Sequence, residues 1–338
     1  MRKDTGKYNK QLSDLIDRSD NITLLCHHNP DGDAIGSMLG LNRYLGLRGK
    51  SAVMISPNHL QDFLMWMRNI DKIIVYDREP GRAVKHIKEA DLIIMLDFNN
   101  IDRSGKLKNH ILSSKAKRVL IDHHPDPDTD VDLLVSEPSF SSSAELVFSL
   151  VTSIEGEYLS DDEFIEAIYV GMMTDTGNFS YGTFNGDTLR DVAVMLDKGL
   201  DRDAISSRVY DNFSISRLRL QGYALYERMV HLEHHNTAYI YLSRADLDRF
   251  KYRTGDTEGF VNIPLTVKDV SLSALFIERE DHIKVSLRSK GDIDVNAFAA
   301  KFFHGGGHLN AAGGKYKGNM NECLEHFEKS LASLQFPG

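Results

Sequence analysis

Three short apolar runs in this sequence stop abruptly at an acidic residue or a histidine. Residues 21–26 are followed by His27, residues 91–96 by Asp97, and residues 119–121 by Asp122, His123 and His124. Continuous apolar runs of this length predict buried strands of a parallel sheet. Because open α/β sheets place their chemistry beyond the carboxyl ends of the strands, we expect these polar residues to lie at one edge of the sheet.

The segments between these runs predict the connections of the sheet. Apolar residues recur at helical spacing over 34–47, and we expect further helices over 82–89 and 103–112 and strands over 51–56 and 73–76. This alternation indicates an α/β fold with a doubly wound, mainly parallel sheet. Additional helices are predicted over 10–18, 141–154, 161–173, 187–196 and 216–229.

The pattern changes after residue 235. Residues 239–242, 272–278 and 282–288 alternate in the manner of strands, and helices are predicted over 295–303 and 322–334. We therefore expect a catalytic domain over residues 1–200, a helical connector over 201–235 and a smaller mixed α/β domain over 236–338. The three histidines within 231–235 are interpreted as an exposed helix end without a metal role.

The charge of the chain argues against a grip on long nucleic acid. The net charge is -9, whereas non-specific polymer binding needs many Lys and Arg side chains to neutralise phosphates. The acidic excess lies entirely before residue 236, where a carboxylate metal site and solvated helix faces both contribute to it.

The cysteines and the apolar segments indicate the cellular location of the protein. Cys26 and Cys323 are too far apart in the sequence to suggest a disulfide framework or a metal motif, so a reducing cytoplasm is the expected location. The start of the chain has no apolar signal region and no run is long enough to cross a bilayer, so neither export nor membrane insertion is expected.

The turn after the first strand reads His27-His28-Asn-Pro-Asp31-Gly-Asp33. Its proline and glycine predict a tight bend that holds the two carboxylates near each other with their side chains diverging, so that each can bind a different cation. His27 or His28 could complete the set, and the spacing alone does not choose between them. The same residues are also common in plain surface turns.

Two further positions add candidate ligands. Alternation along a strand directs His123 and His124 to different sides, which predicts different roles for them. Asp175 ends an apolar helix beside Gly177, although an isolated Asp there is more often a cap or a solvated turn residue.

The combined donor set is rich in oxygen and imidazole and lacks thiolate, which suits Mn²⁺ or Mg²⁺ better than structural zinc. Its members are His27, Asp31, Asp33, Asp97, His123 and Asp175. The set is too large for one catalytic ion, and with Asp97 as a bridge it could hold two. A two-ion centre predicts the hydrolysis of a phosphate ester by in-line displacement.

The last third of the chain contains a candidate phosphate pocket. Gly305, Gly306 and Gly307 precede His308, and three residues without Cβ let backbone N–H groups approach an anion. The following segment is expected to present a helix N-terminus. Arg288 could hold a phosphate bidentately. Alone, the glycine run would usually be a flexible turn and the arginine a surface charge.

Taken together, these motifs resemble the DHH/DHHA1 phosphoesterase superfamily over nearly the whole chain. The resemblance rests on His27-x3-Asp31-x-Asp33, Asp97 after its strand, Asp122-His123-His124, Asp175 in Thr-Asp-Thr-Gly, and Gly305-Gly306-Gly307-His308. Residues 258–262 and 285–291 are similar to the stand-alone nanoRNases, bifunctional enzymes that act on short RNA and on 3′-phosphoadenosine-5′-phosphate (pAp). The membrane-anchored cyclic-dinucleotide branch, which has extra N-terminal segments, is not expected.

The resemblance implies a role for each matching residue. It implies one cation held by His27, Asp31 and Asp97, and another held by Asp33, Asp97, His123 and Asp175, with His28 as scaffold. It also implies that Asp122 orients a histidine, that His124 assists the leaving oxygen, and that Arg288, Gly305, Gly306, Gly307 and His308 bind substrate across an interdomain cleft. His304 stands where many relatives have another glycine, which departs from the pattern.

The expected function is Mn²⁺-dependent hydrolysis of short oligoribonucleotides to mononucleotides, with dephosphorylation of pAp to AMP, and Mg²⁺ as a second usable ion. The alternatives are a phosphodiesterase for cyclic or linear dinucleotides, and a silent nucleotide-binding regulator, whose mark would be a missing metal ligand. Expected partners are short RNA and nucleotide phosphates rather than long duplexes or membranes, and a homodimer is compatible with the sequence. Phe179 or Tyr181 could stack on a base or serve in packing.

Overall fold

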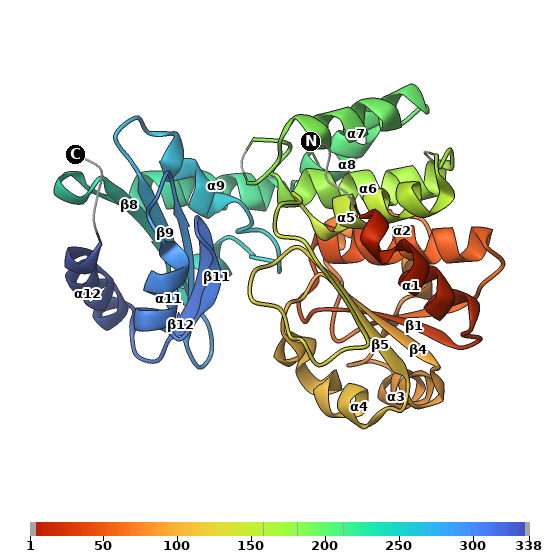
Figure 1. The fold of residues 1–338 in the computed structure, drawn as a ribbon. Coiled ribbons are helices and arrows are strands. Elements are labelled where there is room, and N and C mark those ends of the chain that lie inside the picture. Colours follow the sequence, from red (N-terminus) through yellow and green to blue (C-terminus); the bar gives the residue numbers. More distant parts are fainter. Residues whose placement is uncertain (1–4, 158, 181, 212, 335–338) are drawn as a thin grey trace. The chain divides into compact units, whose positions relative to one another are not determined.

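The computed structural model describes residues 5–157, 159–180, 182–211 and 213–334. The chain divides into two compact units, one over residues 1–212 and one over residues 213–338, and each is described by itself. Figure 1 colours the chain from its N-terminus to its C-terminus.

The first unit is built on a six-stranded sheet in which every neighbouring pair is parallel. The strands lie in the order β3 (Ile74–Val75), β2 (Ala52–Ser56), β1 (Ile22–Cys26), β4 (Leu92–Leu96), β5 (Lys117–Asp122) and β6 (Leu133–Ser136). The chain runs outward from β1 to β3 and then returns to β4 on the other side of β1. This confirms the predicted doubly wound sheet, to which β6 is an addition.

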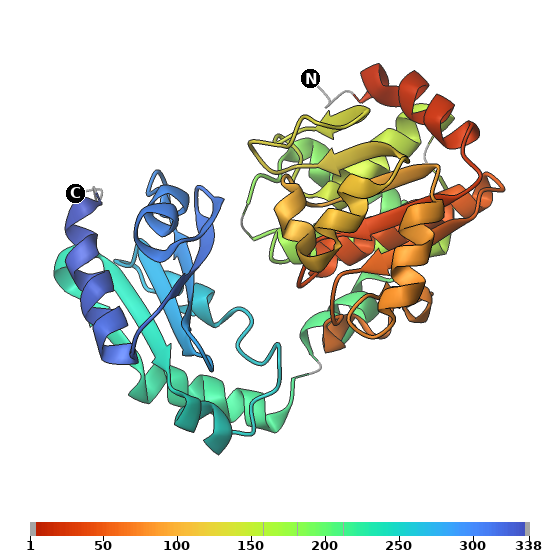
Figure 2. The same cartoon turned by 90° about the horizontal axis from the view of Figure 1, so that it is seen from below.

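Helices cover both faces of this sheet (Figures 1 and 2). One face carries α1 (Gly6–Asp17), α2 (Gly32–Leu47), α5 (Ser143–Glu155) and α6 (Asp162–Asp175), and the other carries α3 (Pro80–Glu89) and α4 (Lys108–Ser113). Alternate strand residues supply the two cores, so that Leu24 packs with the first group of helices and Leu25 with the second. Such two-sided burial explains why the strands lack polar alternation.

The remaining elements of the first unit are helical. Helix α7 (Gly186–Asp197) packs on α6, and α8 (Arg202–Tyr210) packs near the 3₁₀ segment η1 (Asp62–Leu64). Two more 3₁₀ segments are η2 (Ile70–Lys72) and η3 (Ile101–Leu107), the second of which occupies part of the helix predicted over 103–112.

Helices α2 and α6 approach each other closely because glycines lie at their contact. A Cβ on Gly36 would come within 2.5 Å of the Ala167 carbonyl oxygen and 2.8 Å of the Gly171 nitrogen. A Cβ on Gly32 would come within 2.2 Å of Thr174 Oγ1. The start of α2, which carries Asp33, is thereby packed against the end of α6, which carries Asp175.

The second unit has a mixed six-stranded sheet, which confirms the predicted mixed α/β architecture. Its strand order is β11 (Gly306–His308), β12 (Ala311–Tyr316), β10 (Ile283–Ser289), β9 (Leu272–Glu278), β8 (Thr237–Leu242) and β7 (Met229–Leu232), and only the β8–β9 pair is parallel. Helices α11 (Val295–Phe303) and α12 (Met320–Ser330) share one core with the sheet. Helix α9 (Ile215–Glu227) and η5 (Phe260–Thr266) share the other.

Short helical segments complete this unit: α10 (Arg244–Arg249), η4 (Glu233–His235) and η6 (Leu331–Ser333). The residues expected to form a helical connector, 201–235, contain α8 in the first unit and α9 and β7 in the second.

Two sequence-based predictions in this part of the chain are wrong. His231 does not lie at a helix end, because α9 stops at Glu227 and His231 lies in β7, paired with Ala238. His234 and His235 instead end the short 3₁₀ segment η4. Alternate residues Val230 and Leu232 of β7 pack against the core, which is strand periodicity. The glycine run enters strand β11 of the β11–β12 hairpin and is not followed by a helix N-terminus, because Gly306 and Gly307 pair with residues of β12.

Across the described part of the chain, no helix combines the length and the apolarity that a bilayer crossing needs.

The contact between α2 and α6 can be tested with a matched pair of glycine substitutions in α2. Gly36→Ala should lower the free energy of unfolding by about 1–3 kcal/mol, because the added methyl meets backbone atoms that cannot move aside. Gly46→Ala, in the same helix with nothing near its Cβ, should raise it by about 0.5–1 kcal/mol through helix propensity. Urea denaturation of both variants would measure the difference, and equal effects would contradict the proposed close packing.

Candidate metal centre

Three strand ends meet where the strand order of the first sheet reverses. Cys26 of β1 pairs with Leu96 of β4, and Leu96 pairs with Ile121 of β5. The residues that follow these three positions, His27, Asp97 and Asp122, therefore lie side by side at the carboxyl edge. In open α/β sheets, ligands bind in the crevice at this reversal point.

His27 faces two carboxylates. Its Nε2 lies 3.5 Å from Asp97 Oδ2 and 3.8 Å from Asp31 Oδ1, and this buried nitrogen has no hydrogen-bond partner among the described residues. Its Nδ1 lies 3.0 Å from the His28 carbonyl oxygen, which fixes the ring with Nε2 toward the acids. His28 itself donates its backbone N–H to the Arg103 carbonyl oxygen. The structure thus distinguishes the two histidines, which the spacing could not.

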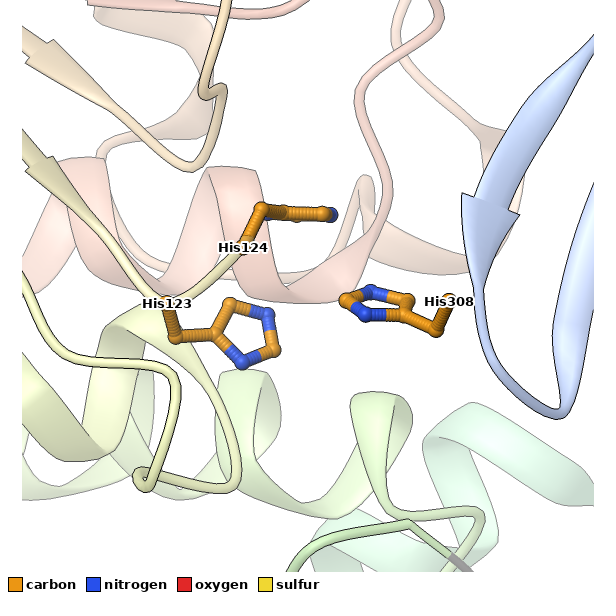
Figure 3. A group of neighbouring side chains, drawn as sticks. All are labelled: His123, His124 and His308. Carbon is orange, nitrogen blue, oxygen red and sulfur yellow. The ribbon is translucent and has the colours of Figure 1, made fainter. Parts of the chain in front are cut away.

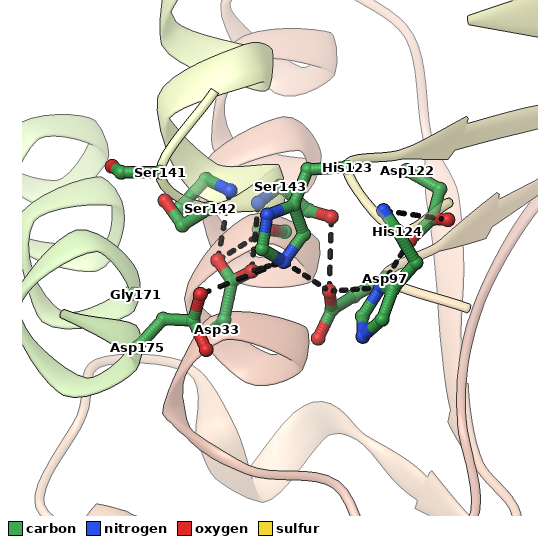
Figure 4. Close-up of polar contacts among 12 residues, drawn as sticks. Asp33, Asp97, Asp122, His123, His124, Ser141, Ser142, Ser143, Gly171 and Asp175 are labelled. Carbon is green, nitrogen blue, oxygen red and sulfur yellow. Dashed lines mark hydrogen bonds and ion pairs between the residues drawn. The ribbon is translucent and has the colours of Figure 1, made fainter. Parts of the chain in front are cut away.

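His123 faces three carboxylates in the same way (Figure 4). Its Nε2 lies 3.8 Å from Asp33 Oδ2, 3.7 Å from Asp97 Oδ1 and 3.5 Å from Asp175 Oδ2. Its Nδ1 lies 3.3 Å from the Phe140 carbonyl oxygen. The two oxygens of Asp97 therefore face different histidines: Oδ2 faces His27 and Oδ1 faces His123.

These separations suit shared cations better than direct hydrogen bonds. Two ligand atoms of one octahedral ion, each about 2.1 Å from it, lie about 3.0 Å apart when adjacent and about 4.2 Å apart when opposite. The distances of 3.5–3.8 Å fall in this interval. The unpartnered His27 Nε2 and the oxygen and nitrogen donor set both fit divalent ions such as Mn²⁺ or Mg²⁺.

Asp97 is held in a strained backbone conformation. Its φ is +64°, in the left-handed region, and the residue is 2% exposed. Such a conformation costs a non-glycine residue about 1–3 kcal/mol and tends to occur at functional positions. The Asp97 N–H donates to the Ile121 carbonyl oxygen, and Asp97 Oδ1 accepts a 2.9 Å hydrogen bond from Ser143 Oγ. Neighbouring elements therefore determine where this carboxylate points.

The start of α5 supports a second carboxylate. The backbone N–H groups of Ser143 and Ala144 donate to Asp33 at 2.7 and 2.8 Å. Free N–H groups and the helix dipole favour an anion at this position. Asp31 caps α2 and accepts from the backbone N–H groups of Asp33 and Ala34.

The sequence reasoning missed Ser143 as part of this centre. The run Ser141-Ser142-Ser143 before an apolar helix was a usable sign of a helix N-terminus. Only the tertiary structure shows which carboxylates that terminus meets.

His124 has different surroundings from His123. The two imidazoles leave the end of β5 in different directions, with their ring centroids 4.7 Å apart and their planes at 66° (Figure 3). The Nδ1 of His124 lies 2.8 Å from Asp122 Oδ1, and its backbone N–H donates to Asp122 Oδ2 at 3.0 Å. Its Nε2 lies 3.3 Å from Nη1 of Arg103, a residue that the sequence analysis did not single out.

Crowded acids shift the ionisation of the centre. Burial and the neighbouring carboxylates, Asp97 first among them, raise the pKa of Asp33 well above its usual value. Burial also raises the pKa of Asp175, to about 6, although His123 opposes the shift. Burial opposes protonation of His27, but Asp31 and Asp97 outweigh it and raise the pKa of this histidine to about 10. The centre therefore favours added positive charge.

Phe179 is the described member of the two predicted stacking residues. It packs on the core of the first unit, and its ring lies 5.9 Å from that of Tyr169 and 6.3 Å from that of Phe184. These contacts are those of a packing residue. Tyr181 lies outside the described residues.

In the second unit, Arg288 and His308 lie on one face of the sheet. Arg288 of β10 and His308 of β11 are both register partners of Ala311 in the intervening β12. Arg288 Nη1 donates to the Leu287 carbonyl oxygen, whereas its buried Nε has no partner among the described residues.

The glycine run allows close backbone packing. A Cβ on Gly305 would come within 1.8 Å of the Gly313 carbonyl oxygen, and one on Gly307, where φ is +156°, within 2.3 Å of the Ala311 carbonyl oxygen. The Gly305 N–H donates to the Ala299 carbonyl oxygen and the Gly307 N–H to Asn296 Oδ1. Two of the three N–H groups are thus already used within the unit, and binding of substrate by this run stays a prediction.

His304, the position at which the family pattern has another glycine, ends α11 with φ +48°. Glycine adopts this left-handed helix end at least cost, which gives a structural reason for that pattern.

Comparison with known families agrees with this geometry. The profile of the DHH family, N-terminal domain, matches residues 21–172, and that of the DHHA1 domain matches residues 236–333. The chain belongs to the DHH family. An exopolyphosphatase-related protein from Bacteroides fragilis, known from a crystal structure, is 41% identical in sequence to this chain. The two structures superpose with a TM-score of 0.92, and the match covers 97% of this chain and 96% of the other.

Two relatives are named for an enzymatic activity. A probable bifunctional oligoribonuclease and PAP phosphatase, NrnA, from Streptococcus mutans is 28% identical over 95% of this chain and 98% of the relative. The cyclic-di-AMP phosphodiesterase PdeA from Listeria monocytogenes is 27% identical over 95% of this chain, which spans 48% of that protein.

Because the pKa of Asp175 is raised, replacing this carboxylate with a neutral side chain should stabilise the fold by an amount that depends on pH. The folded protein binds this proton more tightly than the unfolded chain, so the group stabilises the fold at low pH and this contribution is lost as pH rises through about 6. In chelator-treated protein, Asp175→Asn should therefore raise the free energy of unfolding above pH 7. We expect about 1–2 kcal/mol, less than the full shift implies because the side chain is 30% exposed.

The gain should fall toward zero near pH 4, which urea denaturation across pH 4–8 would measure. Asp130→Asn serves as the control, since that carboxylate is 92% exposed and pairs with Arg118. A gain that is independent of pH would contradict the assignment.

Proposed function

We propose that this DHH-family protein is a two-cation phosphoesterase that hydrolyses short oligoribonucleotides to mononucleotides and dephosphorylates pAp. The observation that carries the proposal is the position of the Asp97 carboxylate between two imidazoles. Its Oδ2 lies 3.5 Å from His27 Nε2 and its Oδ1 lies 3.7 Å from His123 Nε2. A buried carboxylate between two sets of donors is the arrangement that a pair of divalent ions needs.

Each ligand has a proposed place. His27, Asp31 and Asp97 would hold one ion, and Asp33, Asp97, His123 and Asp175 the other. The donor atoms of the first set lie within 4.8 Å of one another, as do those of Asp33, His123 and Asp175 in the second, and Asp97 Oδ1 lies 3.7 Å from His123 Nε2. Another such group, Asp97 with Asp122 and His124, is tied by the hydrogen bonds between Asp122 and His124 and receives no ion. Mn²⁺ is the preferred ion, with Mg²⁺ as a substitute, because imidazole accompanies the carboxylates.

The side chains around the ions have separate tasks. Lewis-acid stabilisation of charge on the phosphoryl group would come from the two cations. Asp122 holds the His124 ring through Nδ1, so that Nε2 is the nitrogen available to the leaving oxygen. Burial lowers the pKa of His124, but Asp122 and Asp97 outweigh it and raise this pKa, which favours a proton-donating role.

Short substrates suit this chain. An acidic protein lacks the cationic track that long RNA needs, whereas a substrate of few nucleotides requires few phosphate contacts. Arg288, Gly305, Gly306, Gly307 and His308 of the second unit are the proposed binding residues for a substrate phosphate. The relative NrnA is named for activity on oligoribonucleotides and PAP. Both cysteines are free and buried, which suits the proposed cytoplasmic setting.

A second candidate activity is cleavage of cyclic or linear dinucleotides. It is favoured by the similarity to PdeA, of which this chain spans about half. Initial rates on cyclic di-AMP, its linear product, a diribonucleotide and pAp, measured with one Mn²⁺-loaded preparation, would separate the two. A diribonucleotide left intact by the wild-type protein would end the leading proposal.

The ion requirement predicts the effect of losing Asp97. Asp97→Ala should reduce hydrolysis of a diribonucleotide by at least about 10³-fold, because the variant removes the oxygens shared by both proposed ions. Chelator should abolish wild-type hydrolysis and added Mn²⁺ should restore it. Asp130→Ala, which removes an exposed carboxylate, should leave the rate within about twofold. Unaltered turnover in Asp97→Ala would contradict the proposed centre.

The Ser143 hydroxyl predicts a contribution to ion binding. Ser143→Ala should weaken Mn²⁺ binding by about 10- to 100-fold, because the hydroxyl orients Asp97 while the backbone N–H to Asp33 survives. Ser142→Ala is the matched control: it removes the cap of α5, which should cost about 1 kcal/mol of stability and leave Mn²⁺ affinity nearly unchanged. Calorimetric titration with Mn²⁺ would measure both, and equal losses of affinity would assign the Ser143 effect to the helix instead.

A further inference from the structure

The segment after Asp97 places Arg103 beside the centre through backbone contacts. The Arg103 N–H donates to the Asn100 carbonyl oxygen at 2.9 Å, and the Arg103 carbonyl oxygen accepts from the His28 N–H at 2.7 Å. The Ile101 N–H donates to Asp128 Oδ2 at 2.7 Å, which ties the segment to the loop after His124. The position of residue 103 is therefore fixed independently of its side chain.

The Arg103 guanidinium lies beside His124. Its Nη1 lies 3.3 Å from His124 Nε2, and among the described residues this is the only hydrogen bond of the guanidinium. Because arginine cannot accept, Nη1 donates and Nε2 accepts, which leaves the imidazole proton on Nδ1 against Asp122. The four further N–H donors of Arg103 make no hydrogen bond within the described residues.

This contact is weak compared with what a guanidinium makes to a phosphate. A hydrogen bond to a neutral ring nitrogen lacks the charge assistance of guanidinium–phosphate pairs, which are also planar and often bidentate. The rest of the centre consists of carboxylates and the imidazoles that face them, so Arg103 adds a fixed positive charge within reach of His124.

We infer that Arg103 is a substrate-binding residue. When substrate binds, its guanidinium gives up the hydrogen bond to His124 Nε2 and donates instead to a non-bridging oxygen of the phosphate under attack. The inference rests on the proposed phosphoesterase function and names a contact that the sequence motifs do not contain. The exchange also frees His124 Nε2, which can then take up a proton from solvent and donate it to the leaving oxygen. Arg103 thus serves binding of the phosphate and access to His124 at once.

The test compares Arg103→Ala and Arg103→Lys with Lys106→Ala, which removes an exposed lysine of the same segment that pairs with Asp77. The probes are a diribonucleotide for kinetics and inorganic phosphate for calorimetric binding to Mn²⁺-loaded protein. Arg103→Ala should raise KM and weaken phosphate binding by about 10- to 100-fold each, with millimolar guanidinium restoring part of the rate. Arg103→Lys should fall between this variant and wild type, and Lys106→Ala should match wild type within about twofold.

Mn²⁺ affinity and thermal stability of Arg103→Ala should remain those of wild type, since Arg103 hydrogen-bonds none of the proposed ligands. Unchanged KM and phosphate affinity in this variant would overturn the inference while leaving the hydrolase standing. Conversely, a wild type that binds phosphate but hydrolyses no nucleotide would contradict the proposed function, and the phosphate titrations would still decide the role of Arg103. If Arg103→Ala lost as much Mn²⁺ affinity as phosphate affinity, the inference would also be overturned. Such a result would show that Arg103 supports the structure of the centre and does not bind phosphate.

Discussion

Repulsion among buried carboxylates is the constraint on which the first unit depends. Asp33 and Asp97 are nearly inaccessible to solvent, and Asp31 and Asp175 lie beside them. Buried like charges are costly unless opposite charge compensates them. Histidines 27 and 123 supply part of that compensation, and divalent ions would supply the rest. The raised pKa values of Asp33 and Asp175 and the raised pKa of His27 are two expressions of the same imbalance.

The surrounding fold holds these acids in place against their repulsion. The first turn of α5 donates two backbone N–H groups to Asp33 and one hydroxyl to Asp97. Glycines let α2 pack tightly on α6, so that the elements carrying Asp33 and Asp175 converge. Rigid helices and strand ends, rather than flexible loops, therefore position most of the proposed ligands, as a precise two-ion centre requires.

The two histidines after β5 show how one strand end can supply two kinds of chemistry. His123 directs Nε2 toward three carboxylates, whereas His124 is bound by Asp122 through Nδ1 and faces Arg103 through Nε2. In each ring, the partner of one nitrogen decides what the other can do. A proposed ion ligand and a proposed proton donor thus follow each other directly in the chain without sharing a role.

The sequence by itself determined the sheet and the candidate ligands. Apolar runs ending at His27, Asp97 and Asp122 reflect burial and strand geometry, which are local properties of the chain. The same local reasoning failed for β7 and for the segment after the glycine run, where pairing with a distant strand decides the structure. It also could not choose His27 over His28, or find Ser143 and Arg103. Those assignments depend on which elements meet in space, and packing between residues far apart in sequence leaves no local pattern to read.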